Sequence, residues 1–103
     1  MITTPSDRET WAKIKGYNYW ISRFGRVKNS KGHILSQKIN NRGFVIVVLS
    51  KDNIQKSFTV QRLVAEAFVP NPDKLPNVQH LDGDRLNNKF TNLKWVKHYN
   101  GCN

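Results

Sequence analysis

Residues 77–95 read NVQHLDGDRLNNKFTNLKW, and the rest of the chain is organised around this stretch. A short apolar segment at its start carries one histidine, His80. The chain then turns at Asp82-Gly83, crosses an Asn-rich loop and returns through residues 93–96. Because Asp-Gly between two hydrophobic runs is a common turn signal, we expect two short strands joined by an irregular loop.

The chain is short and strongly basic. Its 103 residues suit one domain, and 38% hydrophobic residues are enough for a modest core. It has 17 Lys and Arg against 7 Asp and Glu, which gives a formal charge of +10. A charge of this size suggests a polyanionic partner, most often a nucleic acid. The alternative is a basic protein without such a partner.

The positive charge is concentrated in one part of the sequence. Residues 10–62 hold eleven of the 17 basic residues and one acidic residue, Asp52, whereas the remainder is neutral overall. The basic region is therefore a local feature rather than a general bias of composition.

Cys102 is the only cysteine, which excludes an intrachain disulfide and a Cys-x-x-Cys pair for structural zinc. This composition fits a reducing, intracellular compartment. No apolar run approaches the roughly 18 residues of a membrane span, and the first residues lack a signal-peptide pattern. We therefore expect no membrane partner and a protein that stays inside the cell that makes it.

The first 60 residues predict a small antiparallel sheet studded with Lys and Arg. Aromatic and β-branched residues gather in short runs between Gly- and Asn-rich turns, a pattern typical of strands. We expect strands within 17–27, 33–37, 44–49 and 55–60. The run from 44 to 49 is apolar on both faces, so it should be the central strand. Residues 10–14 fit either a helical turn or an extended segment.

Residues 61–68 change from strand spacing to helical spacing. One stripe of a helix would contain Leu63, Val64, Ala67 and Phe68. Pro70 cannot continue an α-helix, so we expect the helix to end just before it.

Several segments resemble those of phage and intron-encoded homing endonucleases. Residues 11–28, WAKIKGYNYWISRFGRVK, resemble their N-terminal modular DNA-binding motif, and residues 43–49 and 60–71 continue it. Residues 80–95, with His80, Asp82-Gly83 and Asn92, resemble their HNH nuclease motif. The resemblance covers roughly residues 11–100, and it rests on the ordered series rather than on any single motif.

This resemblance implies an α+β fold. A small, basic antiparallel β-sheet would be followed by a short helix and a compact ββα-metal HNH core. Residues 1–103 would form a single compact unit, with a basic β-rich DNA-binding motif over 10–60 and the nuclease motif over 61–103.

The same resemblance assigns roles to two residues of the opening stretch. In the nuclease core, a histidine on the first strand is the general base, and an asparagine in the loop ties the two strands together. By position these are His80 and Asn92. The chemistry agrees, because phosphodiester hydrolysis needs a base that works near neutral pH, and histidine is the side chain suited to this.

A divalent cation, Mg²⁺ or Mn²⁺, is also implied. It would stabilise the charge that develops on the scissile phosphate. The predicted ligands are Gln79, beside the base, and Asn100, on the following helix, with Asp82 in reserve. His98 is a rival to Asn100, since imidazole serves at the helix position in some members.

Three features depart from the family pattern. Gln61 stands where relatives commonly have His before Arg-Leu-Val-Ala. Gln79 replaces an Asp or Asn, and its neutral amide predicts weaker cation binding. The spacing from Trp95 to Asn100 is slightly short, which would leave a metal-bearing helix of little more than one turn.

The candidates also have ordinary structural explanations. His80 could be a strand histidine with satisfied hydrogen bonds, and Asp82 and Asp84 suit turn formation better than cation binding. The basic side chains could simply solvate a small sheet. Their concentration before the nuclease motif favours phosphate contacts instead. The predicted DNA-binding residues are Arg23, Arg26, Lys28, Lys31 and Arg42, with Arg62 and Arg85 nearer to the scissile phosphate.

The sequence therefore predicts a metal-dependent endonuclease that acts on double-stranded DNA in the cytoplasm of a phage-infected bacterial host. One ββα site cuts one strand, so a monomer or weak dimer should nick its substrate. The main alternative is a catalytically degenerate HNH-fold DNA-binding protein that acts as a repressor, blocker or inhibitor. A basic interaction module without DNA affinity is a third.

Overall fold

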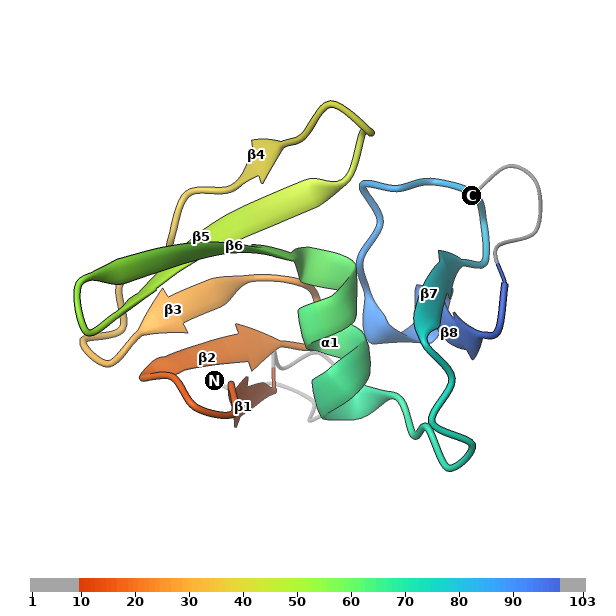
Figure 1. The fold of residues 1–103 in the computed structure, drawn as a ribbon, viewed down its shortest axis with the longest axis horizontal. Coiled ribbons are helices and arrows are strands. Elements are labelled where there is room, and N and C mark those ends of the chain that lie inside the picture. The colour runs from red at the N-terminus through yellow and green to blue at the C-terminus, as the bar shows by residue number, and fades with distance from the viewer. Residues whose placement is uncertain (1–9, 99–103) are drawn as a thin grey trace, which may run out of the picture.

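The computed structural model describes residues 10–98 of the chain. These residues form three small antiparallel sheets, one α-helix and a short 3-10 helix (Figure 1). The predicted α+β class is thus confirmed. Neither helix in this part of the chain is long and apolar enough to cross a membrane.

The first sheet contains most of residues 10–14, for which the sequence allowed either a helical turn or an extended segment. Its strands are β1 (Trp11–Lys13), β2 (Tyr19–Ser22) and β3 (Val27–Asn29), in that spatial order. Ile21 and Val27 lie opposite each other, and both are almost completely buried. The extended alternative for residues 10–14 is correct, because β1 pairs with β2 over most of this segment.

The second sheet is built on the most apolar run of the sequence. Its strands are β4 (Lys38–Ile39), β5 (Val45–Lys51) and β6 (Ile54–Thr59). As predicted, β5 is central, with β4 and β6 on either side. Val45, Val47 and Leu49 face the core, whereas Val48 on the other face is 40% exposed. The tight turn to β6 places Asp52 and Asn53 at positive φ, which suits the twist of a hairpin.

The strand expected at 33–37 is wrong. Ile34 forms an isolated bridge with Lys28, and the Leu35 amide donates to the Val27 carbonyl at 2.9 Å. The described chain then leaves the first sheet and enters the second through β4. This segment is a crossing between sheets, which its apolar residues do not distinguish from a strand.

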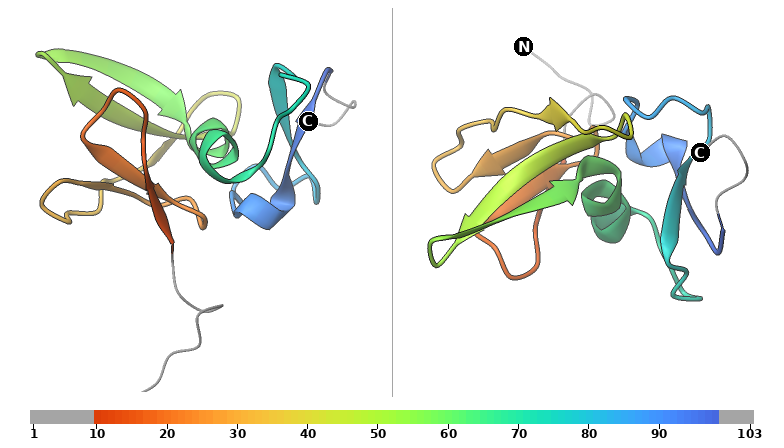
Figure 2. Two further views of the ribbon diagram at one scale, coloured as in Figure 1. Left: turned by 90° about the horizontal axis from the view of Figure 1, so that it is seen from below. Right: turned by 45° about the horizontal axis from the view of Figure 1, so that its top comes forward.

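Helix α1 (Val60–Phe68) follows β6 without a loop and lies at the centre of the fold. Figures 1 and 2 show it between the two N-terminal sheets and the hairpin that follows. Its buried stripe includes Val60, Leu63 and Val64, and the most exposed of these, Leu63, is 4% exposed. The predicted helix is therefore confirmed, and it joins the two N-terminal sheets to residues 77–96.

The opening stretch of the sequence forms the third sheet. β7 (Asn77–His80) pairs with β8 (Leu93–Val96), and a 3-10 helix η2 (Phe90–Asn92) precedes β8. Trp95 is 8% exposed, and its indole Nε1 donates to the Val69 carbonyl at 3.0 Å. This bond fixes the hairpin to the end of α1. The helix expected around Asn100 lies outside the described residues.

A close backbone approach joins the first sheet to the HNH loop, which comprises residues 81–89 between β7 and η2. The Phe90 amide donates to the Arg23 carbonyl at 2.8 Å. Gly25 has φ +92°, and a Cβ at this position would lie 3.2 Å from the Asn88 Cβ and 3.3 Å from the Val60 Cγ1. Only glycine fits both the backbone angle and the available space here.

Gly25→Ala should therefore destabilise the fold more than Gly32→Ala. Gly32 also has positive φ, +84°, but a Cβ there would meet nothing within 4 Å. The left-handed backbone alone should cost about 1–2 kcal/mol in both variants. The crowding against Asn88 should add roughly 1–3 kcal/mol in Gly25→Ala. Urea unfolding of the two variants measures the difference, and equal losses would contradict the close contact.

Candidate active site

His80 ends β7 on its buried face and is 1% exposed. Its Nε2 lies 2.7 Å from the Asn88 Oδ1. Since an amide oxygen only accepts hydrogen bonds, Nε2 is the donor in this contact. Nδ1 is buried and has no hydrogen-bond partner among the described residues. The contact with Asn88 therefore fixes one ring nitrogen and leaves the other unpaired within the described residues.

Phe44 covers one side of this histidine. The two ring centroids are 6.1 Å apart and the planes are inclined by only 21°. The Arg85 guanidinium lies 4.7 Å from the centroid of the same phenyl ring, and its Nη1 donates to the Arg42 carbonyl. The turn before β5 is thus fastened to the HNH loop at the position of the imidazole.

Asn92 ties together the two ends of the loop that carries Asn88. Its Nδ2 donates to the Asp82 Oδ1 at 2.9 Å and to the Asn87 carbonyl at 2.8 Å. Its Oδ1 accepts from the Asp82 amide at 3.1 Å, and its carbonyl accepts from the Leu81 amide at 2.8 Å. These bonds join the residues just after β7 to the residue just before β8, so Asn92 closes the loop.

Asp82 is occupied as an acceptor inside the same loop. Its Oδ2 accepts from the Asn87 Nδ2 at 2.9 Å, and its Oδ1 accepts from the Asp84 amide at 2.8 Å. The Asn87 side chain, then the Asp84 amide and the Asn92 side chain, lower the pKa of the Asp82 carboxyl. These contacts agree with the turn-forming explanation of Asp82.

The predicted cation ligands do not converge within residues 10–98. Successive side chains alternate across a strand, so Gln79 lies on the opposite face of β7 from His80. Asn100 lies outside the described residues, and His98 is exposed near their end. No group of three or more His, Cys, Asp or Glu in the described part could hold a metal ion. These residues alone do not fit a divalent cation.

Aromatic rings hold several of the predicted DNA-binding side chains. Lys28 Nζ lies 4.2 Å, and the Arg26 guanidinium 5.8 Å, from the Trp11 ring centroid. The Arg23 guanidinium lies 4.9 Å from the Phe90 ring centroid. Cation–π contacts of this kind order a long side chain while leaving its charge in place.

Exposure divides these basic residues into two groups. Arg26, Lys31 and Arg42 are exposed, whereas Arg23 and Lys28 are partly buried. The exposed members present their charges at the surface, where a polyanion can contact them.

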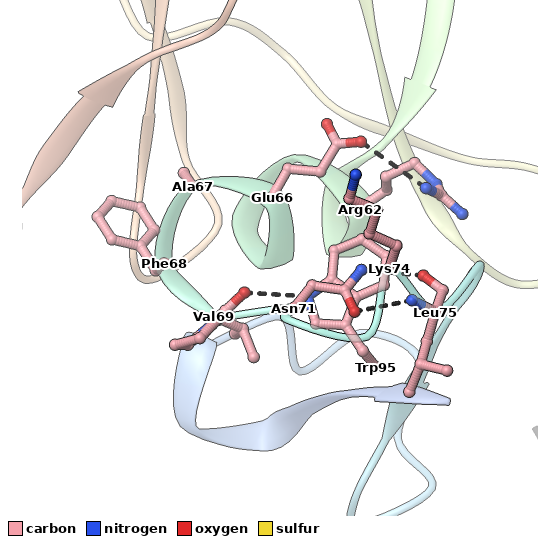
Figure 3. Close-up of a pocket in the computed structure, with 10 residues that line it drawn as sticks. Arg62, Glu66, Ala67, Phe68, Val69, Asn71, Lys74, Leu75 and Trp95 are labelled. Carbon is pink, nitrogen blue, oxygen red and sulfur yellow. Dashed lines mark hydrogen bonds and ion pairs between the residues drawn. The ribbon is translucent and has the colours of Figure 1, made fainter. Parts of the chain in front are cut away.

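Arg62 and Arg85, the two candidates nearest the HNH motif, already make internal contacts. Arg62 donates to the Pro76 carbonyl and lies 3.7 Å from the Glu66 carboxylate. Figure 3 shows it above Trp95, in a cavity of about 480 Å³ at the end of α1 that Lys74 also lines. Arg62 therefore connects α1 to the hairpin, as Arg85 connects the hairpin loop to the turn before β5.

Sequence reasoning missed two residues of the site, Asn88 and Phe44. The sequence places Asn88 only within an Asn-rich loop, whereas in the structure it is the residue that contacts the imidazole. Its position in the paired asparagines, eight residues after His80, was a usable signal. Phe44 offered none, because an aromatic residue beside an apolar strand is ordinarily part of a core.

Comparisons with known proteins agree with the predicted resemblance. A family model described as the NUMOD4 motif matches residues 9–50. An HNH endonuclease of Acanthamoeba polyphaga mimivirus is 42% identical over 94 residues, covering 90% of this chain and 28% of the relative. The DNA endonuclease I-HmuI of Bacillus phage SP01 is 39% identical over 89 residues, covering 84% of this chain and 51% of the relative.

The fold agrees as well. A solved structure described as DNA binding and cleavage by the HNH homing endonuclease I-HmuI superposes with a TM-score of 0.77 at 38% identity. The match covers 84% of this chain and 52% of that chain. The chain thus spans about half the length of I-HmuI and a smaller share of the mimivirus protein.

The hydrogen bonds around the Asp82 carboxylate should make the stability of the protein depend on pH. Because folding lowers the pKa of Asp82, its stabilising contribution is complete above the unfolded value of about 4. It is lost as pH falls through the lower folded value. Asp82→Asn should therefore lower the melting temperature near neutral pH, and the gap to the wild type should narrow in acid.

Thermal unfolding between about pH 6 and pH 3 measures this gap. Asp73→Asn is the control, since Asp73 is an exposed carboxylate outside the loop network. A gap for Asp82→Asn that stays constant over the whole range would contradict the role of the ionised carboxylate.

Proposed function

Because the chain is a relative of the HNH homing endonucleases, we propose that it is a metal-dependent DNA endonuclease that cuts one strand of double-stranded DNA. The observation that carries this proposal is the orientation of His80. Its Nε2 is held by Asn88 while its Nδ1 has no partner among the described residues. A buried nitrogen without a hydrogen bond is unfavourable for the fold, so its retention suggests a chemical use.

In the proposed reaction, Nδ1 of His80 takes a proton from a water molecule. The oxygen of that water forms a bond to phosphorus, and the bond from phosphorus to the leaving oxygen breaks. The Nε2–H bond to Asn88 holds the reactive tautomer and stabilises the imidazolium that forms. Nδ1 is buried, so the water has to reach it as the substrate binds.

Asn92 and Asp82 would act indirectly in this scheme. Their hydrogen bonds fix the loop that presents Asn88 to the imidazole. We regard them as positioning residues, since neither needs to touch the reacting atoms.

The basic surface would hold the duplex by its phosphates. Arg26, Lys31 and Arg42 are exposed on the N-terminal sheets and their turns, and this favours direct contacts. The full proposed set also includes Arg23, Lys28, Arg62 and Arg85. Such contacts release counterions, so affinity should fall steeply with added salt. The phage relative supports action on DNA in a phage-infected bacterial cell.

A divalent cation, Mg²⁺ or Mn²⁺, is part of the proposal. When bound, it would stabilise the negative charge on the phosphate and on the leaving oxygen. Gln79 and Asn100 remain the predicted ligands, with Asp82 in reserve. Among these, Asp82 already accepts three hydrogen bonds, which argues against its use.

The second candidate function is DNA binding without cleavage. It is favoured by one observation, which is that Gln79 lies on the face of β7 opposite the base. A protein that had lost its cation site would keep the fold and the basic surface and could act as a repressor, blocker or inhibitor.

Incubation with supercoiled plasmid separates the two candidates. The proposed enzyme should convert the plasmid to the open circle in Mg²⁺ or Mn²⁺ but not in EDTA. His80→Ala should reduce the nicking rate by roughly 10²–10⁴-fold, the usual contribution of a general base. A gel shift without nicking in either metal would instead support the binding protein.

Asn88 variants test how the base is oriented. Asn88→Ala should slow nicking because the tautomer is no longer fixed. Asn88→Asp should move the rise of the pH–rate profile to higher pH, because a carboxylate stabilises the imidazolium form. Asn18→Asp adds the same charge at an exposed position far along the sequence and should leave the profile unchanged. An unshifted profile in Asn88→Asp would count against the assigned contact.

A further inference from the structure

A second cavity lies beside the candidate base. It has a volume of about 230 Å³ and is bounded by the turn before β5, the N-terminal end of α1 and β7. Phe44 lines this cavity and stacks on His80, and Val78 lines it from the same buried face of β7 as the histidine. A group bound here would therefore sit next to the site of reaction.

The first turn of α1 opens on this cavity without a cap. Thr59 is the N-cap residue, and its side chain makes no capping hydrogen bond. The first turn contains no acidic residue. The amides at the start of a helix and the positive end of its dipole attract anions when no side chain satisfies them.

Gln61 supplies an independent reason to expect a ligand. This residue lines the cavity, is 4% exposed, and has a buried Oε1 without a partner in the described structure. A buried amide without a hydrogen bond destabilises a protein, so a native example calls for an explanation. Rotation of the amide by half a turn would present an N–H group to a bound oxygen.

The charge of the lining defines the class of ligand. Arg42 and Arg62 both line the cavity, and none of its lining residues is acidic. Arg42 is exposed, whereas Arg62 is held by Glu66 and the Pro76 carbonyl. Arg42 is thus the cation that can turn toward a ligand without breaking a described contact.

We propose that this cavity binds a phosphate of the DNA backbone that neighbours the scissile phosphate. The first-turn amides of α1, the Gln61 amide and the Arg42 guanidinium would donate to its oxygens. This inference rests on the proposed function. It adds a subsite that sets the register of the DNA strand relative to His80, since Phe44 contacts both.

The test measures binding of a short DNA duplex over a series of KCl concentrations. EDTA is present, so the proposed nuclease has no cation and does not cut the duplex. Arg42→Gln should reduce the slope of log affinity against log salt by about 1, the loss of one phosphate contact. Lys74→Gln removes the same charge from the separate cavity at the end of α1 and should leave the slope unchanged. Equal slopes for both variants would overturn the proposal.

Gln61→Leu is the sharper variant because its two effects have opposite signs. It should raise the melting temperature by roughly 4–8 °C by removing an unsatisfied buried amide, and it should weaken duplex binding several-fold at an unchanged salt slope. Wild-type affinity in this variant would overturn the proposal. The melting temperature itself shows that the variant is folded.

Two further outcomes separate this inference from a site for a free anion and from the proposed nuclease activity. The side-chain amide resonance of Gln61 should shift on addition of the duplex. A shift with inorganic phosphate but not with the duplex would assign the cavity to a free anion and overturn the DNA assignment. Binding is measured without cleavage, so the two proposals can fail separately. A failure to nick plasmid would refute the nuclease and leave the subsite intact. Wild-type duplex binding by the variants would refute the subsite and leave the nuclease intact.

Discussion

The hydrogen bond between His80 and Asn88 is the contact on which the rest of the site depends. It fixes the tautomer of the imidazole, and it requires a loop that holds an asparagine against the end of β7. Asn92 and Asp82 fix the two ends of that loop, and Gly25 of the first sheet leaves just enough room behind Asn88. The first sheet, the loop after β7 and β7 itself therefore each contribute a residue to the contact at His80 Nε2.

This arrangement explains why the basic sheets and the HNH hairpin share one hydrophobic core. Ile21 and Val47 from the sheets and Val78 and Trp95 from the hairpin belong to a single buried cluster around α1. Because interiors pack closely, a displacement in the sheets would be transmitted to the hairpin through the helix. The basic surface and the candidate base thus rest on one hydrophobic core, within the residues described.

The sequence predicted the features that depend on local signals. The apolar run of β5, the helical stripe of α1 and the Asp82-Gly83 turn each carry their own pattern, and each was found where expected. The crossing at 33–37 was mistaken for a strand, because apolar residues cover a core in either case. The contacts of Asn88 and Phe44 with His80 join residues from separate elements, and no periodicity records them. The position of Gln79 opposite the base could have been deduced from strand alternation alone.

The aromatic contacts of the basic residues have a consequence for how DNA would be held. Trp11 lies under both Lys28 and Arg26, and Phe90 lies under Arg23, so these long side chains have few rotamers left in the free protein. Immobilising such a side chain on binding ordinarily costs about 0.5–1.5 kcal/mol. Here much of that conformational entropy has already been lost during folding. The free energy gained by burying the hydrophobic core offsets this loss. A small basic surface can therefore bind with less loss of entropy than its lysine and arginine content suggests.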